Sequence, residues 1–150
     1  LTTLNLSSNE LDGAAIRSSA PHLGALSSLE SLDLSCNRVD ALLGLPFLPR
    51  LRRLLVPYNR LTSRRGTAPR SVSRIDQSQA LASSLVYLDV RDNRIAGPAH
   101  AHTPHLAALA RLSSLLLMSP GGGQANPVCA STGYREVMFS ATCSLETLDG

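Results

Sequence analysis

The sequence predicts a solenoid built from stacked α/β repeats. Two observations predict it: an eleven-residue pattern, L-x-x-L-x-[LV]-x-x-N-x-[LIV], returns along the chain, and an apolar segment of roughly helical spacing leads into three of its copies. Such repeats bury their apolar face only against a neighbouring copy, and about three copies are the minimum for a stable stack. Copies start at residues 1, 29, 51, 85 and 112, so we expect a single repeat domain over residues 1–150.

Each copy predicts a short strand followed by a turn. Leucines at positions four and six, such as Leu4 and Leu6, alternate with polar neighbours, which is the period-two pattern of a strand with one buried face. An asparagine follows where the chain leaves the strand, and its amide carries the donors and the acceptor that can satisfy the backbone of the bend. We expect a structural ladder of five asparagines: Asn9, Asn37, Asn59, Asn93 and Asn126. The pattern is the signature of leucine-rich repeats.

The spacing of the copies places the rest of each repeat. The intervals are 28, 22, 34 and 27 residues, so 22 is the bare unit and the others carry insertions. Leu45 and Leu48 precede Leu51 by six and three residues, and the pairs before Leu29 and Leu112 keep the same offsets. Extra residues must therefore enter between the asparagine turn and this apolar return segment, on the convex side, where insertions of repeat proteins collect.

Two insertions stand out by composition. Residues Thr62 to Ala80 are polar and rich in Ser and Arg, and such a segment cannot bury enough apolar surface to offset the entropy of ordering it, so we expect a mobile loop. A second insertion, PGGGQA at Pro120–Ala125, separates the fifth strand from its asparagine. The stretch Arg50–Arg74 holds eight of the fourteen arginines, which suggests either a patch for nucleic acid or a solvated loop. We favour the solvated loop, because no aromatic residues alternate with the loop arginines to stack on bases.

Composition and motifs limit the function. No Ser/His/Asp, phosphate-loop or zinc-site pattern organises the reactive residues, and His100, His102 and His105 are expected on a surface loop. We therefore expect neither an enzyme nor a bound metal or cofactor. Three cysteines, an odd number, argue against an extracellular disulfide framework, and no apolar run approaches the roughly eighteen residues of a membrane span. This favours the cytoplasm, with the nucleus or the cilium as alternatives. The chain opens in register at Leu1 without a methionine, so we expect it to be part of a longer protein.

The last 25 residues, 126–150, depart from the repeat pattern and read NPVCASTGYREVMFSATCSLETLDG. Tyr134, Val137, Met138 and Ala141 follow helical spacing, which predicts a short amphipathic helix. Leu145 and Leu148 then repeat the first two strand leucines. We expect this segment to be a C-terminal cap, with Met138, Phe139, Leu145 and Leu148 covering the last leucine layer.

The pattern N-P-V-C…Y-R…L-E-T-L-D-G resembles the C-terminal cap of intracellular leucine-rich-repeat proteins with 22-residue units. This class includes the leucine-rich regulatory subunit of protein phosphatase 1, the spliceosomal A-prime protein and ciliary dynein-associated proteins. The resemblance implies a right-handed arc with a short parallel sheet on its concave side and 3₁₀ or helical turns on its convex side. It also implies a scaffold or adaptor rather than a catalyst.

The alternation of strand side chains predicts which residues face a partner. If Leu54 and Val56 point inward, positions three, five and seven of each copy point to the concave face. The first two strands place small polar groups there, whereas the third to fifth strands place aromatic, apolar and arginine side chains, a composition typical of interface hot spots. The candidate partner-binding residues are Arg53, Leu55, Tyr58, Tyr87, Asp89, Arg91, Leu116 and Met118.

The sequence thus favours a monomeric, non-catalytic scaffold that binds a protein partner. Two alternatives stay open. The first is an RNA-associated, spliceosomal-type repeat protein, in which the arginine-rich segment contacts RNA. The second is a regulatory repeat domain of a larger enzyme.

Overall fold

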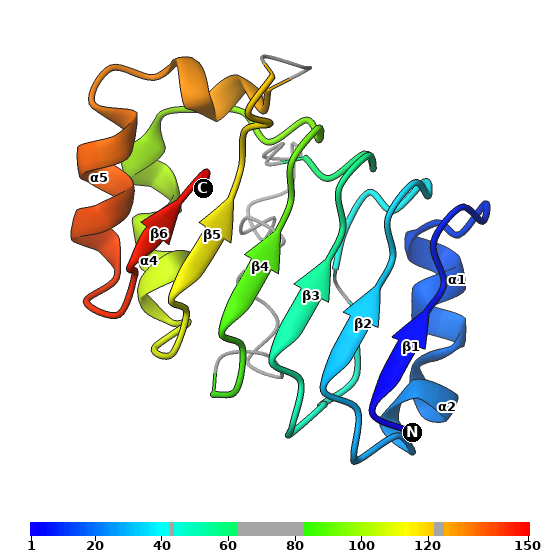
Figure 1. Cartoon of the computed structure of the whole chain (residues 1–150). Helices are drawn as coiled ribbons and strands as arrows, with labels where there is room; N and C mark the ends of the chain where they lie inside the picture. Colours follow the sequence, from blue (N-terminus) through cyan, green and yellow to red (C-terminus); the bar gives the residue numbers. More distant parts are fainter. Residues whose placement is uncertain (43, 63–82, 122–124) are drawn as a thin grey trace, which may run out of the picture.

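The computed structural model describes residues 1–42, 44–62, 83–121 and 125–150. Most of the predicted mobile loop, at residues 63–80, and residues 122–124 of the PGGGQA insertion lie outside this described part of the chain. Six strands form one sheet in sequence order, every neighbouring pair parallel: β1 (Thr3–Asn5), β2 (Ser31–Asp33), β3 (Arg53–Leu55), β4 (Tyr87–Asp89), β5 (Ser114–Leu116) and β6 (Thr147–Leu148) (Figure 1). This arrangement confirms the predicted leucine-rich-repeat solenoid.

The register of the sheet aligns the repeat positions across the coils. Leu4 pairs with Leu32, Leu32 with Leu54, Leu54 with Leu88, and Leu88 with Leu115. The position-four leucines of the second to fifth copies are at most 2% exposed, and the leucines at position one and the leucines or valines at position six are buried beside them. Because strand side chains alternate, this column fixes positions three, five and seven on the opposite face of the sheet.

The asparagines join successive coils. Nδ2 of Asn93 donates to the carbonyl of Val56 in the preceding coil at 2.8 Å and to Val90 in its own coil at 3.0 Å. Its Oδ1 accepts from the backbone N–H of Leu61 at 2.8 Å. Asn37 and Asn59 repeat this arrangement. Asn126 also does so despite its insertion, bonding to Val90, Leu117 and Ile95.

Helices line the convex side, behind the sheet in Figure 1. Helices α1 (Gly13–Ser18) and α2 (Ala20–Gly24) follow the first strand, and the 3₁₀ helix η1 (Ala99–His102) with helix α4 (Thr103–Ala107) follow the fourth. Asp12 caps α1 by accepting the N–H of Ala15 at 2.8 Å, as an aspartate at this position is expected to do. The expectation of a histidine-bearing surface loop is wrong: the three histidines lie in η1 and α4, and His102 is only 7% exposed.

The C-terminal end is closed by the 3₁₀ helix η2 (Pro127–Ala130), helix α5 (Tyr134–Ala141) and β6. Tyr134 and Met138 of α5 and Leu148 of β6 are buried in the core. Phe139, expected to cover the last leucine layer, instead stands 39% exposed, because the residue after Met138 on a helix turns away from the face that Met138 buries. Tyr134, not Phe139, supplies the aromatic ring of this end.

The carboxylate of Asp149 accepts backbone N–H groups of the fifth coil at the C-terminal end of the sheet. Oδ1 of Asp149 accepts the N–H groups of Leu117 at 2.8 Å and Met118 at 2.9 Å. In the earlier coils, a backbone carbonyl of the next strand accepts the N–H at position six, and the position-five side chain of the same coil accepts the N–H at position seven in three of them. Oδ2 of Asp149 accepts the hydroxyl of Tyr134 at 3.1 Å. Burial is the main reason that the pKa of Tyr134 is raised, so this hydroxyl stays a donor. The Asp149 carboxylate therefore satisfies two N–H groups at the C-terminal end of the sheet.

A candidate protein-binding face

The concave face is the sheet surface formed by positions three, five and seven of the coils. In Figure 1 this surface is turned toward the viewer, with helices α1, α2 and α4 behind it. The register makes each position a straight row across the sheet. Position three reads Thr3, Ser31, Arg53, Tyr87, Ser114, and position five reads Asn5, Asp33, Leu55, Asp89, Leu116. The structure thus brings most of the predicted binding residues into two neighbouring rows.

Arg53 and Tyr87 are cross-strand partners in the position-three row. The guanidinium carbon of Arg53 lies 4.2 Å from the centre of the Tyr87 ring. This is a cation–π contact, worth about 0.5–1 kcal/mol at an exposed site. Arg53 is exposed and Tyr87 is half-buried, so the pair forms an accessible platform on the sheet.

Asp89 was expected on the exposed concave surface, and this is wrong, because the residue is only 2% exposed. Its carboxylate accepts both the Nε and the Nη2 of Arg91, at 3.0 and 2.7 Å, and also the backbone N–H of Arg91. The arginine therefore covers the carboxylate. The hydrogen bond to Asp89 is the largest cause of the raised pKa of Arg91, and the nearby Tyr87 and Tyr58 add to it. The charge of Arg91 is compensated within the protein.

The apolar members of the face lie further along the strands. Leu55, Leu116 and Met118 are all half-buried, so part of each side chain is open to a partner. Leu55 and Leu116 flank Asp89 in the position-five row. Half-buried apolar groups beside an arginine and a tyrosine are the composition from which interface hot spots are built.

Tyr58 stands at position eight, outside the rows, and is 59% exposed. Its φ is +54°, and position eight of the other three regular copies (Ser8, Cys36 and Asp92) is also left-handed, at +56°, +54° and +52°. A left-handed conformation costs a bulky residue roughly 1–2 kcal/mol, so the turn after the strand imposes it on whatever residue is there. The sequence gives no glycine signal for this turn, which is why the pattern alone does not reveal it.

The concave face of the first two strands has a different chemistry. Thr3, Asn5 and Ser7 are small and polar, and Asn5 bonds back to the N–H of Ser7. Asp33 is likewise occupied locally, accepting the N–H of Ser35 at 2.8 Å and the Ser35 hydroxyl. These groups offer a partner neither an apolar anchor nor a free cation.

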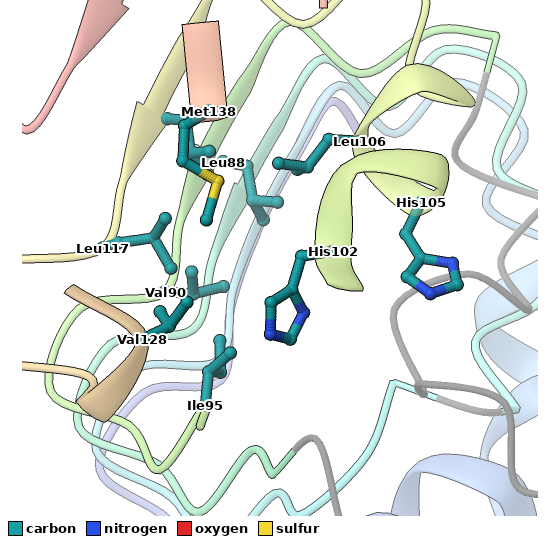
Figure 2. A pocket seen from close by; sticks show the side chains of 10 residues that line it. Leu88, Val90, Ile95, His102, His105, Leu106, Leu117, Val128 and Met138 are labelled. Carbon is teal, nitrogen blue, oxygen red and sulfur yellow. The ribbon is translucent and has the colours of Figure 1, made fainter. Parts of the chain in front are cut away.

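A small apolar cavity lies on the other side of the sheet, between β4, β5 and the convex helices (Figure 2). Its volume is about 20 Å³, which is roughly enough for a single water molecule. Figure 2 shows the ring of His102 turned toward Val90 and Ile95. Nε2 of His102 bonds to the carbonyl of Ala96 at 3.1 Å, and burial is the main cause of its lowered pKa. This cavity, which His105 also lines, is a packed interior too small for a cofactor.

The chain is similar to known leucine-rich-repeat proteins in both sequence pattern and structure. A sequence model described as "Leucine Rich repeat" matches residues 1–17 and 25–41. The structure is similar to a chain in the crystal structure of the Drosophila melanogaster SNF/U2A′ complex, with a TM-score of 0.71 and 23% sequence identity over 98% of this chain and 71% of that chain. The chain has the leucine-rich-repeat fold. A comparison with curated protein sequences gives no significant match.

Two further observations concern membrane spans and the cysteines. Within the described residues, no helix is both long and apolar enough to cross a membrane. Cys36, Cys129 and Cys143 are all free thiols, Cys36 and Cys143 exposed and Cys129 half-buried. Burial is the main cause of the raised pKa of Cys129, which makes its thiol a poor nucleophile.

Proposed function

We propose that this chain is a non-catalytic scaffold that binds a protein partner on the concave face of β3–β5. The observation that carries the proposal is the clustering of the Arg53–Tyr87 platform with half-buried Leu55, Leu116 and Met118 on one exposed sheet surface. Interfaces concentrate their binding energy in a few aromatic, arginine and apolar groups of this kind. The small polar groups on β1 and β2 make that end a poor anchor.

The solved relative supports this mode of action. It is named as a member of the SNF/U2A′ complex, so a chain of this fold occurs there in an assembly. What is carried over to this chain is the mode, a repeat scaffold joined to another protein, and not the partner itself. The proposal involves no cofactor, no metal and no membrane, and it treats the chain as a monomer before the partner binds.

The proposed compartment is the cytoplasm or the nucleus. Three free cysteines, two of them exposed, suit a reducing environment, whereas secreted proteins usually pair their cysteines. The cilium is compatible with the same observation.

A second candidate function, RNA association, is favoured by one specific feature. Position ten of the second, third and fourth copies is an exposed arginine, and backbone bonds join these coils: Arg38 to Leu11, Arg60 to Val39 and Arg94 to Leu61. Arg38 is paired with Glu10 at 3.0 Å, whereas Arg60 and Arg94 form no ion pair with another described residue and could contact a polyanion. An RNA binder should lose affinity steeply between 50 and 200 mM salt, as counterion release requires. No RNA binding at low salt would remove this candidate.

The scaffold proposal is tested by substitutions on the concave face at the proposed binding strands, β4 and β5, and at β1 as a control. Tyr87→Ala and Leu116→Ser should each reduce the amount of partner that co-purifies from cell extract by roughly tenfold or more, as expected for hot-spot residues. Thr3→Ala, in the same row as Tyr87, is the matched control and should leave capture unchanged. Thermal melts of all three variants check that the fold is intact. Capture that survives both substitutions would contradict the proposal.

A further inference from the structure

We propose that the concave face recognises an acidic–apolar peptide segment, whose carboxylate binds Arg53 and whose apolar side chains contact Leu55, Leu116 and Met118. This inference rests on the proposed function and adds the chemistry of the partner to it. It follows from the different ion pairing of the two arginines on the same face and from the positions of the apolar groups relative to them.

The two arginines are not equivalent. Arg91 holds the carboxylate of Asp89 through two side-chain hydrogen bonds, so its charge is already neutralised. Arg53 contacts the ring of Tyr87, and among the described residues no carboxylate lies within ion-pair distance of it. A ring face supplies a quadrupole but no counter-charge. Arg53 is therefore the one uncompensated cation in the described concave rows.

Arg53 is also partly ordered before any partner binds. Its guanidinium carbon lies over the Tyr87 ring, 4.2 Å from the centroid, and this contact restricts the side chain while it uses none of the guanidinium N–H donors. A carboxylate can then accept two parallel hydrogen bonds, the geometry that guanidinium groups favour. Pre-ordering lowers the entropy lost on binding, which otherwise costs about 0.5–1.5 kcal/mol for a flexible side chain. The platform is suited to a single planar anion.

The neighbouring rows set the spacing in the partner. Leu55 and Leu116 lie two residues further along their strands than the Arg53 row, and Met118 lies two residues further again. Two strand residues span about 7 Å. A carboxylate on Arg53 and an apolar side chain on Leu55 are therefore about two residues apart in an extended peptide, or three to four apart on a helix. Leu116 and Met118 lie two strands further across the sheet, roughly 10 Å to the side, and would contact more distant residues of the partner. Asp33, on the strand next to Arg53, disfavours a second acid towards the N-terminal strands.

A nucleic acid fits this face less well than a peptide. A phosphate backbone carries a charge at every nucleotide and needs several cations in a row. The described concave rows instead hold one free arginine together with the carboxylates of Asp33 and Asp89. A single acid flanked by apolar groups matches both the charge and the apolar area, so we take the peptide as the occupant.

The experiment selects peptides on the whole chain. Random dodecapeptides displayed on phage are enriched separately on the wild type, on Arg53→Glu and on Arg53→Met, with Arg17→Glu, an exposed arginine on the convex helix α1, as the control. Wild type and control should enrich Asp or Glu at a fixed distance from Leu, Met or Phe. Arg53→Glu should enrich Lys or Arg at that position instead. Arg53→Met, which keeps an apolar contact with Tyr87 but no charge, should lose the charge preference.

Measured affinities of the leading peptide complete the test. Its affinity should fall roughly tenfold or more on Arg53→Glu and recover when its acid is changed to lysine, because opposite charges again meet. Unchanged binding to Arg53→Glu, with binding still lost on Leu116→Ser, would overturn this inference and leave the proposed function standing. Absence of enriched peptides, or peptides indifferent to Leu116→Ser, would overturn both. Displacement of the peptide by a uridine oligonucleotide at 150 mM salt would overturn the choice of a peptide.

Discussion

The first and fourth copies match the same repeat pattern but are enclosed by neighbouring coils to different degrees. Leu4 and Leu6 of the first copy are only partly buried, whereas Leu88 and Val90 of the fourth are at most 2% exposed. Asn9 is exposed and donates only to carbonyls of its own coil, those of Leu6 and Ser7. Asn93 is buried and bonds to both its own coil and the preceding one.

The two copies also differ in the chemistry of their concave side chains. There the first copy has Thr3, Asn5 and Ser7, and the fourth has Tyr87, Asp89 and Arg91, at the same backbone positions. Nothing in the repeat pattern dictates these residues, because the sheet accepts either set.

The comparison separates two roles within one motif. The leucines and the asparagine stabilise the coil in proportion to how completely neighbouring coils enclose them, as expected when repeat stability is a sum of nearest-neighbour interfaces. The concave residues at position three contribute little to that sum and can vary with the partner, whereas Asn5, Asp33 and Asp89 at position five each accept the N–H of position seven in their own coil. The following substitutions test this division in pairs, one from each copy.

Leu88→Ala should have the largest effect. Removal of a buried leucine side chain costs about 2–5 kcal/mol of unfolding free energy, since a cavity remains. Leu4→Ala should cost less than about half of this, because its side chain is already partly exposed. Urea denaturation of both variants measures the difference. Equal losses would mean that the two copies are enclosed equally in solution.

Asn93→Ala should be next, at about 2–4 kcal/mol. It leaves the buried N–H of Leu61 without its acceptor and the carbonyl of Val56 without this donor, and each such group costs roughly 1–3 kcal/mol. Asn9→Ala should cost below about 1 kcal/mol, because water replaces the exposed amide. If chemical denaturation gave similar values for both, the inter-coil bonds would not be the source of the stability.

His102→Gln should change the pH dependence of stability rather than its value at neutral pH. Burial lowers the pKa of His102, so in mild acid the unfolded chain binds a proton that the folded chain does not. The histidine's contribution is therefore complete above its unfolded pKa of about 6.5 and falls as the pH drops towards the folded value. The neighbouring His105 opposes protonation further.

The measurement for His102 is the slope of unfolding free energy against pH between pH 7.5 and pH 5. The slope should flatten in His102→Gln and stay as in the wild type in His22→Gln, an exposed histidine on α2. An unchanged slope in His102→Gln would show that another group dominates the acid response.

Much of the fold could be predicted from the sequence, because it follows from local periodicity. The alternation around Leu54 and Val56 predicts a strand with one buried face, and the spacing of Tyr134, Val137, Met138 and Ala141 predicts the helix now seen as α5. Asn126 was assigned across an insertion because only one asparagine follows the fifth strand at a workable distance.

Other features depend on side-chain contacts that the repeat pattern does not specify, and these were not predictable. The chain around His102 looks like a polar loop, yet the ring is buried because Val90 and Ile95 of the same coil are close to it. Asp89 looks like an exposed concave acid, but the side chain of Arg91, two residues on, covers it. Asp149 could have been noticed only from the L-D-G that ends the chain, since its partners Leu117 and Met118 lie about thirty residues away.

The central claim is that the leucines and asparagines hold the solenoid while the concave rows bind the partner. The most direct test is an alanine scan of the position-three row, Thr3, Ser31, Arg53, Tyr87 and Ser114, with melting temperature and binding of the selected peptide measured on each variant. We predict small shifts in melting temperature throughout, with losses below about 1 kcal/mol as for surface substitutions, and a loss of binding confined to Arg53→Ala and Tyr87→Ala. Binding lost equally along the row, or lost only in variants that also unfold, would contradict the claim.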